Sequence, residues 1–176
     1  DSTMGILLIF VLYLITMLSI FGGHATSLII RRTGGNPYQG RINSMLVFAF
    51  FPLLGLVAQP LGGLSCWFPI IIIGIIGAAH QSWSANAYSI GSDLFPKSFV
   101  ATITGISGMA GGIGSFLLNK GSGTLFTYAD QTQMQALGFE GKEAGYMIVF
   151  CICALAYIIS WGIVKALVPK YKAVNI

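Results

Sequence analysis

The chain has 176 residues, of which 55% are hydrophobic and 8% carry a charge, and its net charge is +4. About a quarter of the residues in a soluble globular domain are charged, so this composition excludes that class and indicates an integral membrane protein. The basic residues lie in separate turns between apolar segments, which also argues against a nucleic-acid-binding surface.

Five mostly apolar segments are long enough to cross a membrane as helices, because about 20 apolar residues span the hydrocarbon core. Strands of a membrane barrel would be about ten residues long and would alternate in polarity, which these segments do not do. The sequence therefore predicts an all-α integral membrane protein with an exposed external loop at residues 120–143. The predicted spans are residues 4–30, 42–64, 66–94, 97–119 and 144–167.

The basic residues are divided unequally between the two ends of these spans. Lys120 and Lys142 fall at one end, and the other seven fall at the opposite end. Because lysine and arginine concentrate in short cytoplasmic loops, the sequence predicts an external amino terminus and a cytoplasmic carboxyl terminus. The seven are Arg31, Arg32, Arg41, Lys97, Lys165, Lys170 and Lys172.

The segment 66–94 changes from CWFPIIIIGIIGAA to HQSWSANAYSIGSD near its middle. With about 100° of rotation per residue, most of its polar side chains share one sector of the helix. A polar strip at this depth is typical of a helix that lines an aqueous cavity or a solute path, and hydrogen bonding between helices is the alternative. The candidate solute-contacting residues are His80, Gln81, Asn86 and Tyr88.

Other polar and small residues have structural explanations. We expect Ser92 or Asp93 to cap amide groups at the turn SDLFPKS, with Pro96 at the start of the next helix. His24 either pairs near a turn or relays protons. Glycines in TGISGMAGGIGS form a ridge that favours close helix packing, although they also leave room for a solute or a bend. These packing candidates are Gly105, Gly108, Gly111 and Gly112.

The blocks HQSWSAN, SDLFPK and GMAGGIG, with the preceding turn GGHATSLIIRR, resemble the carboxyl-terminal half of a major facilitator superfamily transporter. The resemblance is to the hexuronate transporters of the anion:cation symporter branch and covers nearly the whole chain. Two positions depart from the wider family, with Ser27 where many members have aspartate and Gly108 where other branches have asparagine. The glycine fits the uronate pattern.

This resemblance implies a fold and a function. The five spans would be equivalent to helices 8 to 12 of a twelve-helix fold, forming part of the carboxyl-terminal six-helix bundle, and the amino-terminal half would be missing. We therefore expect a fragment of a multi-pass transporter in a bacterial inner or plasma membrane. It would import an organic anion such as glucuronate or galacturonate by symport with a cation, usually a proton. No cofactor, metal or nucleic acid is implied.

The chemistry of a sugar acid requires a cation for its carboxylate and hydrogen-bonding groups for its hydroxyls. No arginine or lysine falls inside a predicted span, so we expect the missing half to supply the arginine and the proton-linked acid. The alternatives are a channel or structural membrane subunit and, less favoured, an intramembrane enzyme. The enzyme is disfavoured because His80 and Ser84 have no orienting carboxylate and no GxSxG motif is present.

Overall fold

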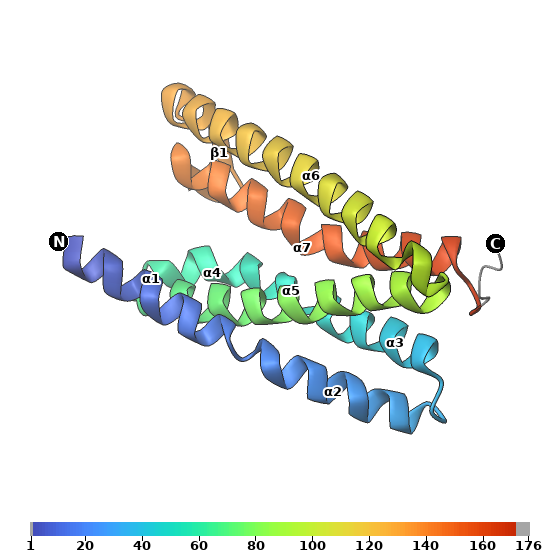
Figure 1. The fold of residues 1–176 in the computed structure, drawn as a ribbon. Helices are drawn as coiled ribbons and strands as arrows, with labels where there is room; N and C mark the ends of the chain where they lie inside the picture. Colours follow the sequence, from blue (N-terminus) through green and yellow to red (C-terminus); the bar gives the residue numbers. More distant parts are fainter. Residues whose placement is uncertain (1, 172–176) are drawn as a thin grey trace.

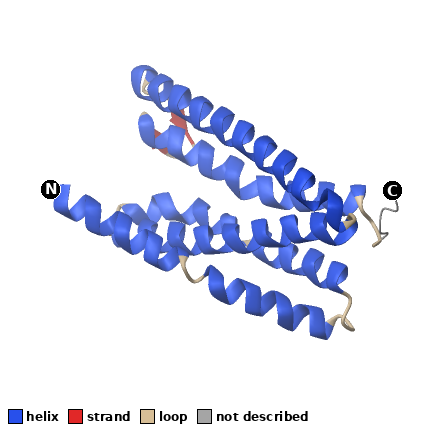
Figure 2. Ribbon diagram, in the orientation of Figure 1, coloured by secondary structure: helices blue, strands red, loops and turns tan. Residues whose placement is uncertain are grey.

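The computed structural model describes residues 2–171, which form helices joined by turns and one short hairpin (Figures 1 and 2). The elements in chain order are α1 (Ser2–Thr16), α2 (Ser19–Arg32), α3 (Pro37–Ala49), the 3₁₀ helix η1 (Phe51–Leu54), α4 (Gly55–Gly62), α5 (Trp67–Leu94), α6 (Lys97–Thr132), β1 (Gln135–Ala136), β2 (Phe139–Glu140) and α7 (Lys142–Leu167).

Five helical stretches within the described residues are long and apolar enough to cross a membrane, which confirms the prediction of an all-α chain with five candidate spans. Many of their large apolar side chains face outward; Ile20 is 75% exposed, for example, and Met109 is 70% exposed. Apolar exposure on this scale is unfavourable in water and is expected where the surrounding solvent is lipid. The stretches are Thr3–Arg32, Pro37–Gly62, Trp67–Leu94, Lys97–Thr132 and Lys142–Leu167.

The second span begins earlier than the sequence analysis predicted. The side chain of Asn36 caps α3 by accepting a hydrogen bond from the amide of Gln39 at 3.1 Å, and Pro37 occupies the first helical turn. Both residues are typical of a helix start. Arg41 therefore lies inside the span rather than in the preceding loop, and the prediction that no arginine lies in a span is wrong.

The predicted loop 120–143 is also wrong over most of its length, because α6 continues to Thr132. Its hydroxyls do not disrupt the helix, since those of Thr124 and Thr127 donate to backbone carbonyls four residues earlier. The helix ends at Gln133, which adopts a left-handed conformation with φ of 49°. The hairpin β1–β2 then leads into α7.

The first span is interrupted at Met17–Leu18, between α1 and α2, although it contains no proline. The amide of Leu18 bonds to Ile15 and that of Ile20 bonds to Met17, which is a tighter, 3₁₀-type pattern. One turn earlier, the hydroxyl of Thr16 donates to the carbonyl of Leu12 at 2.9 Å, a bond that bends helices. Figure 1 shows the resulting change of direction.

α5 is the central helix and contacts α1, α2, α3, α4 and α6. The first part of α3, the second half of α5 and the last part of α7 share a core built around Tyr38, Ile42, Met45 and Ile90. Trp83 and Trp161 pack against it. The face of α5 with Trp83, Ala87, Ile90 and Leu94 forms its part of this core.

α6 diverges from α5 along most of its length (Figure 1). It approaches α5 near their connecting turn, where Gly91 faces Ile103, and approaches α7 near its other end, where the Phe126 and Tyr146 ring centroids lie 4.4 Å apart. Between these points, residues 104–121 are all exposed.

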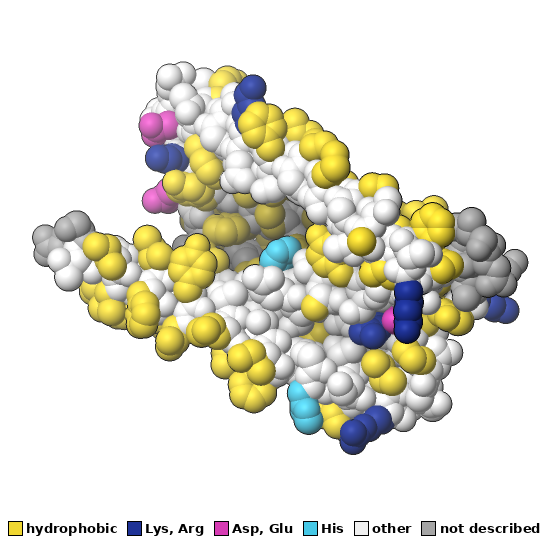
Figure 3. All heavy atoms as spheres, in the orientation of Figure 1, with side chains coloured by type: hydrophobic (Ala, Val, Ile, Leu, Met, Phe, Trp, Pro, Cys, Tyr) yellow, Lys and Arg dark blue, Asp and Glu magenta, His cyan; other side chains and the backbone are white. Residues whose placement is uncertain are grey.

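The charged side chains gather at the two ends of the bundle (Figure 3). One end in Figure 1 holds the α2–α3 turn, the α5–α6 turn and the end of α7, and these segments carry basic residues such as Arg31 and Lys170. The hairpin and the α4–α5 turn lie at the other end. The segments that the sequence analysis placed on one side thus lie together, with Lys172 outside the described residues.

Two adjacent glycines of α2 test the packing of α2 on α5. A Cβ at Gly22 would overlap the side chain of Ser82, whereas a Cβ at Gly23 would meet nothing within 4 Å. We expect Gly22→Ala to lower the free energy of unfolding by about 1–3 kcal/mol through overpacking. Gly23→Ala is the matched control and should be neutral or stabilising, because alanine favours a helix. Thermal unfolding of the purified protein, followed by circular dichroism, measures both, and equal stability of the two variants would contradict this packing.

Candidate functional site

A groove of about 470 Å³ lies between α2 and α5 and includes one residue of α3. It faces the second half of α5, where the sequence changes from apolar to polar. Two of the predicted contact residues, Gln81 and Asn86, lie in it. Its lining consists of Ser19, Ile20, Gly23, Thr26, Ser27 and Ile30 from α2, Arg41 from α3, and Gln81, Ser82, Ala85, Asn86 and Ser89 from α5.

Asn86 joins the two helices beneath this groove. Its side chain is buried, and its Nδ2 donates to the hydroxyl of Thr26 at 3.0 Å and to the carbonyl of Ser82 at 2.8 Å. Its Oδ1 has no hydrogen-bond partner among the described residues. A buried acceptor without a donor is unfavourable by about 1–3 kcal/mol. This oxygen has almost no accessible surface, so the Asn86 side chain would have to move before a solute in the groove could donate to it.

Toward a solute in the groove, most of the serine hydroxyls can act as acceptors, because their hydrogens are already donated within the protein. The hydroxyls of Ser27 and Ser89 donate to carbonyls of their own helices, those of Gly23 at 3.1 Å and Ala85 at 2.8 Å. Their oxygens retain lone pairs for a further donor. Gln81 is exposed and makes no side-chain hydrogen bond within residues 2–171, so its amide can both donate and accept.

Arg41 brings a positive charge to the groove that the sequence analysis missed. Its Nε donates to Oδ2 of Asp93 at 2.8 Å, and the two side chains are 24% and 32% exposed. The sequence analysis predicted a capping role for Asp93. The structure shows instead that its side chain links α5 to α3. The start signal Asn36–Pro37 was the feature of the sequence that could have placed Arg41 inside the span.

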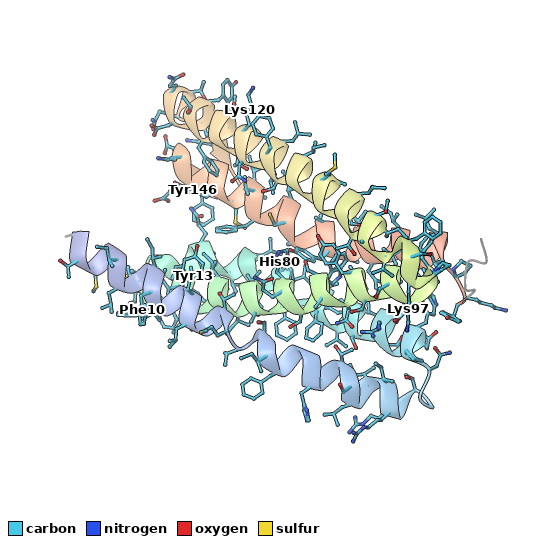
Figure 4. The ribbon with its side chains drawn as sticks, in the orientation of Figure 1. Phe10, Tyr13, His80, Lys97, Lys120 and Tyr146 are labelled. Carbon is cyan, nitrogen blue, oxygen red and sulfur yellow. The ribbon has the colours of Figure 1, made fainter. Side chains whose placement is uncertain are left out.

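His80 lies on a different side of α5 from the groove. Six residues separate His80 from Asn86, which turns their side chains about 120° apart. His80 reaches toward α7 (Figure 4), where its Nδ1 lies 2.5 Å from the hydroxyl of Tyr157 and the two rings meet edge to face. The ring of Trp83 also packs edge to face on Tyr157. The structure thus separates His80 from Gln81 and Asn86.

Tyr88 and His24 also lie outside the groove lining. Tyr88 is 45% exposed and points about 160° away from Asn86 by rotation about the α5 axis. His24 is an exposed residue of α2. Of the four predicted solute contacts, the structure therefore brings only Gln81 and Asn86 together.

The glycines predicted to pack against another helix have open space around them. A Cβ placed at Gly105, Gly108, Gly111 or Gly112 would meet nothing within 4 Å among the described residues. No helix of residues 2–171 therefore uses this ridge, and close packing there stays a prediction about a partner segment.

Comparison with known proteins gives no match: no family model matches the sequence, and neither a curated protein nor a solved structure is detectably similar to it. The resemblance to the major facilitator superfamily stays a prediction, and the groove has to be interpreted from its own chemistry.

The bond between Asn86 and Thr26 can be tested by an isosteric substitution. Thr26→Val keeps the side-chain shape and removes the acceptor of the Asn86 amide. We expect a loss of about 0.6 kcal/mol, and at most about 1.7 kcal/mol, in unfolding free energy, which is the range for such bonds in membranes. Ser27→Ala is the control, because the Ser27 hydroxyl bonds only to its own helix. A Thr26→Val variant as stable as Ser27→Ala would contradict the bond.

Proposed function

We propose that this chain is part of a secondary active transporter that imports an organic anion of the hexuronate class by symport with a cation. The observation that carries the proposal is the groove between α2 and α5, whose lining includes serines, Gln81 and Arg41. Polar groups inside an apolar bundle are unfavourable unless they serve a solute, an ion or a neighbouring helix.

The composition of the groove supports a polyhydroxylated solute. Hydroxyls of a sugar acid both donate and accept, so they can pair with the serine oxygens and the amide of Gln81. A purely apolar solute would leave these groups without partners. A groove of about 470 Å³ has room for a solute of this size and for water.

In this proposal a second bundle covers the groove. Alternating access requires two bundles that move about a shared site, and the groove belongs to one of them. The exposed stretch 104–121 of α6, with its glycine ridge, offers a surface for the other bundle. The basic end of the structure faces the cytoplasm, as lysine and arginine do in short loops. The coupling proton is carried by the second bundle.

Uptake of labelled glucuronate and galacturonate by the full-length protein in proteoliposomes tests the function. We expect saturable uptake that depends on a proton gradient. Gln81→Ala should reduce it by about tenfold or more, because it removes a hydrogen bond to the solute. Asn86→Ala should also reduce it, because it removes the bond to Thr26 that joins the two walls of the groove. Thr127→Ala, at an exposed site of α6 outside the groove, is the control and should leave uptake unchanged.

Two results would contradict the proposal. Unchanged affinity and rate in both groove variants would remove the groove from the solute path. Flux that neither saturates nor depends on a cation gradient would instead indicate a channel, which is the competing function. Unfolding midpoints of all variants should be measured in parallel, so that a loss of folded Asn86→Ala protein is not mistaken for a loss of binding.

A further inference from the structure

We infer that Arg41 binds the anionic end of the solute in the α2–α5 groove, and that the solute does so by taking the place of Asp93. This inference rests on the proposed function and replaces one part of it, since the sequence alone had assigned the anion-binding arginine to a segment outside this chain.

The geometry leaves Arg41 able to bind a second group. Its guanidinium has five N–H donors, and its Nε is the nitrogen that pairs with Asp93, at 2.8 Å. Its terminal nitrogens have no protein partner within residues 2–171, and the residue belongs to the groove lining together with Asn86. An anion that enters the groove therefore meets a cation whose terminal nitrogens are free.

The Arg41–Asp93 pair also lies where a carboxylate from the groove could replace Asp93. Arg41 and Asp93 are 24% and 32% exposed, so the pair is only partly buried and Arg41 can still be reached from the groove. A carboxylate can instead bind a guanidinium through two parallel hydrogen bonds, which is the stronger geometry. Release of the Asp93 side chain would then be balanced by its hydration at the edge of the bundle.

The end of α5 stays anchored when the Asp93 side chain is released. The main-chain carbonyl of Asp93 accepts a hydrogen bond from the hydroxyl of Tyr171 at 3.3 Å, independently of the carboxylate. Tyr38, Ile42 and Ile90 also hold α3 against α5 through the buried core. Exchange at Arg41 therefore requires a side-chain movement and no separation of the helices.

The class of ligand follows from the groups along the groove. Arg41 selects an anionic group, and the oxygens of the serines, with the amide of Gln81, select hydroxyls. A monocarboxylate that carries several hydroxyls satisfies both. A neutral sugar of the same size would satisfy the hydroxyl-binding part and leave Arg41 paired with Asp93.

Calorimetric binding to the full-length protein in nanodiscs tests the inference, with D-glucuronate as the probe and D-glucose as its neutral counterpart. We expect Arg41→Gln to weaken glucuronate binding by about tenfold or more and to leave the weaker glucose binding unchanged. Arg41→Lys should recover only part of the loss, because lysine lacks the planar fork of arginine. Asp93→Asn removes the competitor and should strengthen glucuronate binding severalfold.

The opposite signs of the two variants separate binding from a structural role. Both Arg41→Gln and Asp93→Asn break the same ion pair, so a purely structural pair predicts that both lower affinity for both probes. That result would overturn the inference, and so would unchanged glucuronate affinity in Arg41→Gln. Neither outcome affects uptake by the wild-type protein, so the proposed function would remain. A wild-type protein that neither binds nor transports any hexuronate would instead overturn the proposed function, and the inference with it.

Discussion

The hydrogen bond from Asn86 to Thr26 is the interaction on which the groove depends. It joins two helices through side chains that are both buried, so neither amide nor hydroxyl has an easy alternative partner. It also fixes the direction of the Asn86 amide, because both of its amide hydrogens are used by Thr26 and Ser82. The acceptor is consequently left on the opposite side, without a partner. Close approach of the helices, which Gly22 permits beside Ser82, makes this arrangement possible.

The α2–α5 seam and the α5–α7 contact divide the polar residues of one helix between two roles. Asn86, Ser82 and Gln81 face α2 and the groove, whereas His80 faces Tyr157 of α7. The apolar face between them builds the core that anchors α3 and α7. α5 therefore supports the bundle and forms a wall of the groove at the same time, and a substitution on one face leaves the other largely undisturbed.

Run length and polarity predicted the helices well, because crossing a hydrocarbon layer imposes a minimum length on every span. The residues at which the helices begin and end were harder to predict than the helices themselves. Residues 120–132 include many polar side chains, yet α6 continues through them to Thr132, with the hydroxyls of Thr124 and Thr127 bonded to carbonyls of the preceding turn. The polar half of α5 was also predictable, and Asn86 and Gln81 with it. Rotation about one helix axis could not show which neighbour each residue meets, so His80 was grouped with Asn86, and Arg41, which comes from another helix, was missed.

α6 has a mechanical property that follows from its two points of attachment. It is fastened near Ile103 against Gly91 and near Phe126 against Tyr146, and the residues between them are exposed. A stiff helix supported at both ends transmits a sideways force on its centre to both supports. Pressure on the middle of α6 is thus delivered simultaneously to the last turns of α5, close to the Arg41–Asp93 pair, and to the first turns of α7 at the far end of the molecule.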